Sequence, residues 1–145
     1  MNQIISVIIP AFNEEASIGL VVNDIPKEIV KHVIVVNNGS TDNTVEVAKK
    51  AGAIVVDEPR KGYGWACLKG ISKSKELNTT IVVFMDGDYS DYPEEIKDIL
   101  EPILNNQKEL VIGSRVLGKR EKGSLTPQQI FGNWLATKLM RIFYR

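Results

Sequence analysis

The sequence predicts an α/β protein with a mostly parallel sheet and helices on both faces of that sheet. Apolar runs rich in β-branched residues recur along the chain, and segments with helical periodicity separate them. The runs do not alternate apolar with polar residues, so both faces of each strand should be covered, as in a parallel sheet between helices. Strands are expected at residues 4–9, 33–36, 54–56 and 81–85, with a weaker one at 110–112.

The segments between the first strands carry helix signals. Apolar residues at helical spacing over residues 18–25 predict a helix, with Asn13 as its N-cap and Pro26 as its stop. A second helix should open at residues 40–42 and end at Gly52.

The later helices follow the same logic. A basic glycine loop at residues 60–64 precedes a helix, and Pro93 opens another that should be kinked or shortened at Pro102. A capping box at residues 126–129 predicts a last helix, with an apolar stripe that includes Trp134.

Composition narrows the class of protein. The 145 residues suit one domain over residues 1–145, which can bury roughly 70% of the unfolded chain's surface. Lys and Arg number 18 and balance 18 Asp and Glu, so no global field attracts nucleic acid, and we expect no nucleic-acid partner. Because the chain stops inside the last predicted helix, we expect the domain to be truncated at its C-terminal end.

Cysteine and histidine usage excludes several kinds of site. Cys67 and His32 are each alone, which excludes a disulfide framework, a thiolate metal cluster and a His-rich zinc site. The N-terminus has no signal-peptide pattern, and the apolar run at 81–85 is far shorter than the roughly 20 residues that cross a bilayer. We expect a reduced, cytoplasmic protein, with contact to the inner face of the membrane left open.

In α/β sheets, ligands bind outside the carboxyl ends of the strands. The first strand runs into residues 10–15, which contain neither a G-x-G-x-x-G turn nor a P-loop. The segment at 62–64 begins like the former, but Cys67 replaces its third glycine. Taken alone, Asn13 and Glu14 fit a helix cap with a favourably placed acid.

The second strand ends in the run Asn37-Asn38-Gly39-Ser40. A tight turn followed by an N-cap explains this run on its own. Its place at a strand's carboxyl end also suits recognition of a nucleobase or a ribose, and both interpretations stay open.

The fourth strand leads directly into Asp86-Gly87-Asp88. Two carboxylates just past a buried strand form a hard-oxygen site for Mg²⁺ or Mn²⁺, whose octahedron substrate phosphates and water complete. An EF-hand is excluded, because Asp91 and Lys97 stand where that loop needs glycine and glutamate. A solvated acidic turn and the D-x-D of a haloacid-dehalogenase-type phosphatase are the alternatives.

Positive groups should lie at the same edge of the sheet. The weak fifth strand leads to Arg115, whose guanidinium matches phosphate oxygens, and the basic loop at 60–64 precedes a helix N-terminus. Together these signals place a metal site and positive groups on one edge.

The ordered motifs resemble those of family 2 glycosyltransferases of the GT-A type, a Rossmann-like fold, and are similar to those of dolichyl- and polyprenyl-phosphate sugar synthases. They lie at residues 7–15, 35–44, 61–66 with Gly70, 86–88, 93–96 and 113–115. The resemblance implies a metal-dependent, inverting transfer of a sugar from a nucleoside-diphosphate sugar to an acceptor, such as a polyprenyl phosphate. The alternative is a nucleotide-sugar-binding fragment without turnover.

The resemblance also implies roles for residues. Asp86 and Asp88 would hold Mg²⁺ or Mn²⁺ on the donor diphosphate, and Arg115 would face the phosphates. The nucleotide-sugar pocket would comprise Pro10, Ala11, Phe12, Asn13, Glu14, Asn37, Asn38, Lys61, Gly62, Asp86, Gly87 and Asp88.

The sequence departs from the family pattern at three places. The family commonly has Asp-Asp at the positions of Asn37 and Asn38. The two asparagines of this chain therefore remove negative charge from the base contact. Ser90 stands where dolichyl-phosphate mannose synthases often carry a Gln metal ligand, and residues 128–129 are glutamines where those enzymes place an acceptor-phosphate Arg. If the acceptor is a polyprenyl phosphate, the basic, aromatic last helix is where we expect peripheral membrane contact, with a core helix as the alternative.

Overall fold

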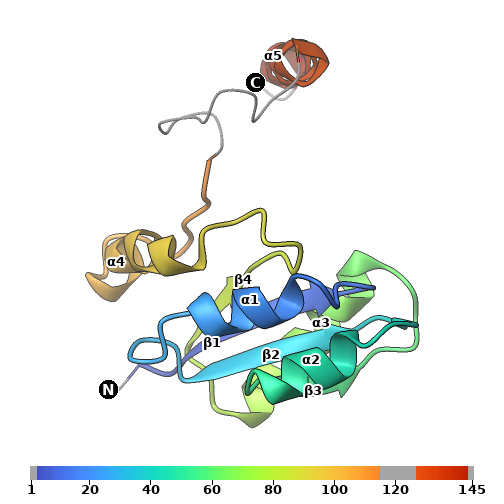
Figure 1. Cartoon of the computed structure of the whole chain (residues 1–145). Helices are drawn as coiled ribbons and strands as arrows, with labels where there is room; N and C mark the ends of the chain where they lie inside the picture. Colours follow the sequence, from blue (N-terminus) through green and yellow to red (C-terminus); the bar gives the residue numbers. More distant parts are fainter. Residues whose placement is uncertain (1–2, 115–126, 144–145) are drawn as a thin grey trace. The chain divides into compact units, whose positions relative to one another are not determined.

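The computed structural model describes residues 3–114 and 127–143 (Figure 1). The chain divides into two compact units, the first ending at Glu109 and the second beginning at Leu110. The two units are therefore described separately.

The first unit is built on a four-stranded, wholly parallel sheet in the order β3-β2-β1-β4. The strands are β1 (Ile5–Ala11), β2 (His32–Asn37), β3 (Ile54–Asp57) and β4 (Ile81–Phe84), which confirms the four main predicted strands. Ala11 pairs with Asn37 and Asn37 with Asp57, so the carboxyl ends of β1, β2 and β3 lie side by side.

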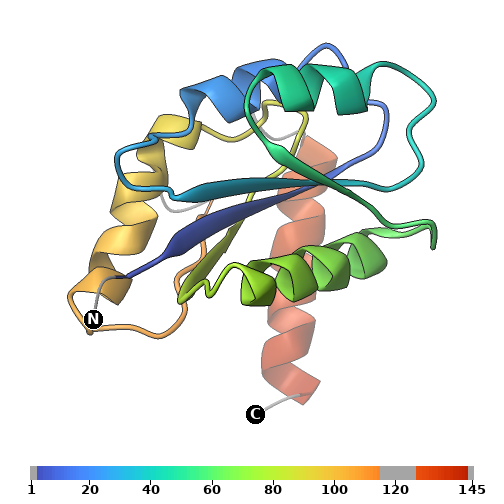
Figure 2. The ribbon, with the colours of Figure 1, turned by 90° about the horizontal axis from the view of Figure 1, so that it is seen from below.

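Helices cover both faces of this sheet, as predicted (Figure 2). α1 (Ile18–Asp24) and α2 (Thr44–Lys50) lie on one face, and α3 (Tyr63–Glu76) lies on the other. The 3₁₀ helix η1 (Pro93–Glu95) leads into α4 (Ile96–Leu104), whose buried residues join the core on the α1 side. α4 continues through Pro102 and ends two residues later.

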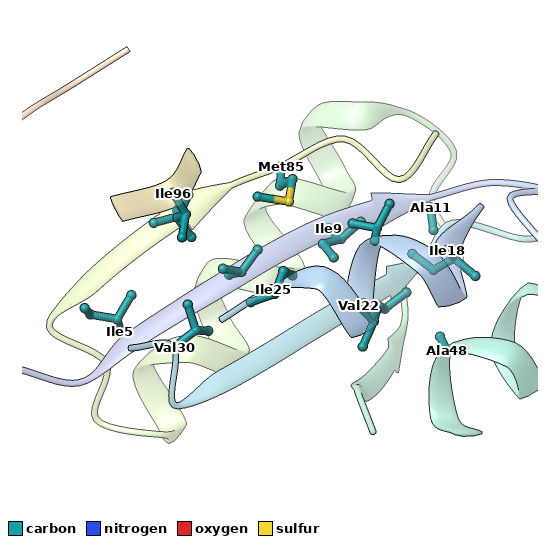
Figure 3. Packing of buried hydrophobic residues seen from close by; sticks show 14 of the residues in the cluster. Ile5, Ile9, Ala11, Ile18, Val22, Ile25, Val30, Ala48, Met85 and Ile96 are labelled. Atoms are coloured by element: carbon teal, nitrogen blue, oxygen red, sulfur yellow. The ribbon is translucent and has the colours of Figure 1, made fainter. Parts of the chain in front are cut away.

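The two faces of β1 support apolar clusters of different size. Alternate residues of β1 join α1, α2 and α4 in the larger cluster, whose labelled members are shown in Figure 3. On the other face, Ile8, Ile34 and Val36 meet Ala66 of α3 in a smaller cluster. There Gly70 lies so close to β1 that an added Cβ would stand 2.3 Å from Ile8 Cγ2.

Three local predictions were wrong. α2 begins at Thr44 with Asn43 as its N-cap, rather than at residues 40–42. The N-cap of α1 is Ser17 rather than Asn13, which has a left-handed backbone with φ 58°. Residues 110–112 form no strand: Leu110 and Ile112 are 74% and 78% exposed, and no described strand pairs with them. An apolar run this short has no stability as a strand unless a partner supplies the ladder.

The described part of the second unit contains α5 (Pro127–Phe143), the predicted last helix. Thr126 of the predicted capping box lies outside the described residues. The aromatic rings of Phe131 and Trp134 are 5.9 Å apart, and Lys138 Nζ lies 5.0 Å from the Trp134 ring centroid. Within the part of the chain that the structure describes, no helix has both the length and the apolar character needed to cross a bilayer.

Candidate functional site

A pocket of about 360 Å³ opens at the carboxyl edge of the sheet. Eight of the twelve residues predicted for the nucleotide-sugar pocket line it, together with two residues of α3 that sequence reasoning missed. The lining residues are Pro10, Ala11, Phe12, Glu14, Asn38, Tyr63, Ala66, Asp86, Gly87 and Asp88.

The first wall of the pocket is the loop that follows β1, which is hydrogen-bonded to the loop that follows β2. Asn13 Oδ1 accepts a hydrogen bond from the Thr41 N–H at 2.8 Å, and the Asn13 N–H donates to Ser40 Oγ at 3.1 Å. The Glu14 N–H donates to Thr44 Oγ1 at 2.8 Å. Asn13 is therefore a link between two loops, 28 residues apart in sequence, beside the pocket rather than in its lining.

Glu15 and Asp42, which were not predicted as site residues, extend this link. Glu15 Oε2 accepts from the Asn43 N–H at 2.9 Å, and the Glu15 N–H donates to Asp42 Oδ2 at 3.2 Å. Desolvation alone would raise the pKa of Asp42, but hydrogen bonds from Thr44 and from the Glu15 N–H outweigh it and lower that pKa. Both loops are thus held as one rigid edge.

The second wall contains the two consecutive asparagines after β2. Asn37 Nδ2 donates to Asp57 Oδ1 at 2.8 Å, and Asn37 Oδ1 accepts from the Ser40 N–H at 2.9 Å. Asn38 Nδ2 donates to the carbonyl oxygens of Glu58 and Arg60, while Asn38 Oδ1 accepts from the Gly62 N–H at 2.7 Å. Asn38 lines the pocket and Asn37 stands behind it.

The loop after β3 is fixed by a buried carboxylate. Glu58 is 2% exposed, and its two oxygens accept from Arg60 Nε and Nη2, each at 2.8 Å. These side-chain hydrogen bonds lower the pKa of Glu58 to about 2. The Arg60 guanidinium carbon lies 3.9 Å from the Trp65 ring centroid, a cation–π contact.

Lys61 and Gly62 belong to a neighbouring hollow rather than to the main pocket. This second hollow, of about 660 Å³, is lined by Lys61, Gly62, Gly64, Trp65, Cys67 and Leu68. The structure therefore separates these two predicted residues from the other eight, although the same loop and helix connect the two hollows.

The third wall is the turn after β4. Asp86 and Asp88 both line the pocket and both are exposed residues, while Gly87 between them is buried. The Asp86 N–H lies 3.3 Å from Asp91 Oδ2, and Asp88 Oδ1 accepts from the Ser90 N–H at 2.9 Å. These bonds give the turn a defined conformation that presents two carboxylates to one space.

The Asp86 and Asp88 carboxylates fit a divalent cation whose remaining ligands come from a substrate and from water. Residues 3–114 and 127–143 contain no group of three or more His, Cys, Asp or Glu able to hold a metal by themselves. Hard carboxylate oxygens suit Mg²⁺ or Mn²⁺, and phosphate oxygens and water supply the remaining positions. Arg115, the predicted phosphate contact, lies outside the described residues.

Tyr63 and Ala66 reach the pocket because α3 starts at its rim. Burial is the main cause of the raised pKa of the Tyr63 hydroxyl, and repulsion from Asp86 and from Cys67 in its ionised form adds to it. Residues three apart on a helix share a face, so the i, i+3 spacing of Tyr63 and Ala66 after the glycine loop is the signal that could have found them.

The family model described as glycosyl transferase family 2 matches residues 6–145. The chain belongs to this family. Its α/β fold is of the GT-A type, and the resemblance inferred from the motifs is confirmed.

Curated relatives of this family 2 chain include glycosyltransferases from archaea. A UDP-N-acetylglucosamine–dolichyl-phosphate N-acetylglucosaminyltransferase of Methanococcus voltae is 31% identical over 91% of this chain and 60% of its own length. A hexosyltransferase of low-salt glycan biosynthesis from Haloferax volcanii is 30% identical over 97% of this chain and 34% of its own length. The chain thus spans 60% of the length of the first of these relatives and about a third of the length of the second.

A solved relative has been crystallised with a divalent metal ion and UDP. Glucosyl-3-phosphoglycerate synthase of Mycobacterium tuberculosis, in complex with Mn²⁺, UDP and its product, superposes with a TM-score of 0.61 and 32% identity. The match covers 71% of this chain and 40% of that one. The same enzyme has also been solved with Mg²⁺ and UDP.

Proposed function

We propose that this family 2 chain binds a uridine-diphosphate sugar with Mg²⁺ or Mn²⁺ and transfers the sugar with inversion at its anomeric carbon. The observation that carries the proposal is that Asp86 and Asp88 line the same 360 Å³ pocket as Pro10, Glu14 and Asn38. Residues that follow β1, β2 and β4, which are distant in sequence, thereby line one pocket together with this pair of carboxylates. The UDP and Mn²⁺ found in the solved relative support the choice of donor.

The chain's own groups divide the work of donor binding. In this proposal the edge from Pro10 to Glu14 receives the nucleoside, and Asp86 and Asp88, which line the same pocket, face the diphosphate. A divalent ion held there supplies stabilisation of the negative charge that develops on the leaving diphosphate. Arg115 is proposed to add positive charge beside the same phosphates.

We propose a polyprenyl phosphate as acceptor, and the similarity to the dolichyl-phosphate N-acetylglucosaminyltransferase of Methanococcus voltae supports this choice. An acceptor phosphate is already ionised at neutral pH, so the transfer requires no general base from the protein. Residues 128 and 129 are glutamines, whose amide groups carry no charge, so positive charge for the acceptor phosphate has to come from other residues.

α5 is proposed to contact the membrane surface that presents such an acceptor. Trp134 is 55% exposed, and Lys138 and Arg141 accompany it on this helix. Cationic and aromatic side chains favour the headgroup region of anionic bilayers. Binding to anionic vesicles should weaken when both charges are reversed; binding that the reversal leaves unchanged would contradict this role.

The experiment that tests donor binding is a thermal-unfolding panel with UDP, GDP and CDP, each with Mn²⁺, with Mg²⁺ and with neither. A ligand at about 100 times its Kd stabilises the folded state by about 2.7 kcal/mol. We expect a metal-dependent rise in Tm with UDP that Asp88→Asn abolishes and that the matched control Asp98→Asn, in the first turn of α4, preserves. No rise with any nucleotide, or an equal rise in Asp88→Asn, would contradict the proposal.

A fragment that binds donor without turnover is the second candidate, favoured by the fact that the chain spans only 60% of the Methanococcus voltae relative. Incubation with UDP-N-acetylglucosamine, Mn²⁺ and a polyprenyl phosphate separates the two candidates. Formation of the glycolipid by this chain alone excludes the binding fragment, whereas a nucleotide-dependent rise in Tm without product supports it.

A further inference from the structure

We propose that Asn38 is a positioning residue, whose side-chain amide sets the conformation of the loop at residues 58–62 and thereby places Tyr63 and Ala66 in the pocket. The inference rests on the proposed donor site, because the pocket matters only if it holds a ligand. It differs from the interpretation that Asn38 reads the nucleobase with its side chain.

Both N–H groups of the Asn38 side-chain amide, and its oxygen, form hydrogen bonds. Asn38 Nδ2 donates to the Glu58 carbonyl at 2.9 Å and to the Arg60 carbonyl at 2.8 Å. Asn38 Oδ1 accepts from the Gly62 N–H at 2.7 Å. One side chain therefore satisfies three backbone groups of a single loop, at sequence separations of 20 to 24 residues.

Only an amide satisfies this arrangement. A carboxylate has no hydrogen to donate, so in Asn38→Asp the oxygen that replaces Nδ2 would stand less than 3 Å from two carbonyl oxygens. An unsatisfied or repelled backbone carbonyl costs free energy, and the loop would move away to regain water. The loop can yield there, because Gly62 has a φ of 126°, a conformation that suits glycine.

Further interactions hold the same loop, and one of them involves Trp65, whose fluorescence can report a movement of the loop. The Glu58 N–H donates to the Asn37 carbonyl at 2.9 Å, which continues the β2–β3 ladder into the loop. Arg60 is held by Glu58 and lies over Trp65, in the first turn of α3. A shift of the loop therefore changes the surroundings of the Trp65 indole, which is 44% exposed.

Three readouts in a Trp134→Phe background, which leaves Trp65 as the only tryptophan, test the proposal. They are the Kd for UDP with Mn²⁺, acrylamide quenching of Trp65, and amide hydrogen exchange over residues 58–66. The variants are Asn38→Asp and Asn38→Ala, and Asn105→Asp at the exposed end of α4 is the charge-matched control.

We expect Asn38→Asp to weaken UDP binding at least tenfold, to increase quenching of Trp65 and to speed exchange over 58–66. Asn38→Ala should show the same changes more weakly, because water can reach the freed carbonyls without repulsion. Asn105→Asp should leave all three readouts unchanged. If Asn38→Asp does not fold, Asn38→Ala still decides, since the expected loop readouts and the loss of affinity must appear together.

Weaker UDP binding with unchanged quenching and exchange would overturn the proposal, because the side chain would then act on the ligand directly. A larger loss in Asn38→Ala than in Asn38→Asp would overturn it too, since a base contact retained by the Asp oxygens would explain that order. If the wild type and Asn105→Asp bind no nucleotide, the proposed donor site fails. Quenching and exchange then still decide whether Asn38 holds the loop.

Discussion

The two faces of the sheet hold their helices by different means. On one face, α1, α2 and α4 pack through a large cluster of fully buried aliphatic side chains. On the other face, α3 meets only a small cluster, and its position depends on the close approach of Gly70 to Ile8 and on polar links at its N-terminal loop. The larger cluster supplies bulk stability, whereas the smaller face places pocket residues.

Because the two faces differ in this way, substitutions on them should affect stability and the pocket to different extents. Substitutions in the large cluster should lower the free energy of unfolding of the whole first unit. Substitutions on the α3 side should also change where Tyr63 and Ala66 stand, because few apolar contacts compensate for a shift there. Variants on each face can test this difference between the two faces.

The largest expected effect is on the α4 side, at Leu100, which is 1% exposed in the large cluster. Leu100→Ala should lower the free energy of unfolding by about 2–5 kcal/mol, because it removes buried methyl groups and leaves a cavity. Leu104→Ala, at a side chain 41% exposed, is the matched control and should change it little. Urea unfolding followed by circular dichroism measures both, and equal losses would contradict the assignment of the core.

A smaller loss of stability, but a larger effect on the site, is expected at Gly70. A Cβ at this position would stand 2.3 Å from Ile8 Cγ2, so Gly70→Ala should cost about 1–3 kcal/mol and push α3 outward. Gly64→Ala, in the same helix with open space around it, should change stability by no more than about 1 kcal/mol in the stabilising direction. Urea unfolding compares the two, and the account fails at this point if Gly70→Ala is as stable as wild type.

The smallest effect is expected from the titration of Glu58. Its pKa falls from 4.5 to about 2 in the folded protein, so the carboxylate contributes stability above pH 4.5 and loses that contribution as the pH falls toward 2. Stability of the wild type should therefore decline more steeply over this interval than that of Glu58→Gln. Urea midpoints at pH 7, 5, 4 and 3 measure the two slopes, and parallel curves would show that the Glu58–Arg60 pair contributes nothing.

Much of the fold and part of the site follow from the sequence. The runs of β-branched residues predict all four strands, and parallel strands end at one edge, which brings residues 10–12, Glu14 and residues 86–88 into one pocket. The partners of Asn13 and Asn38 were not predictable, because their hydrogen bonds reach across 20 to 28 residues and depend on backbone positions in the folded loops. Local patterns do not encode such distances.

The prediction of a strand at residues 110–112 was wrong for a related reason. Its three apolar residues carry the right composition, but strand formation depends on a neighbouring strand that supplies hydrogen bonds, and composition does not report this. Arg115 follows the same segment and stays a prediction, since it lies outside the described residues.

The central claim is that a nucleotide and a divalent ion meet at the edge formed by β1 and β4. The most direct test is paramagnetic broadening of backbone amide resonances when Mn²⁺ is added to the ¹⁵N-labelled chain, with and without UDP. We expect UDP to make Mn²⁺ broaden the resonances of Ala11, Gly87 and Asp88 selectively, while Asn105, the C-cap of α4, keeps its intensity. Broadening that does not depend on UDP, or that appears away from the pocket, would contradict it.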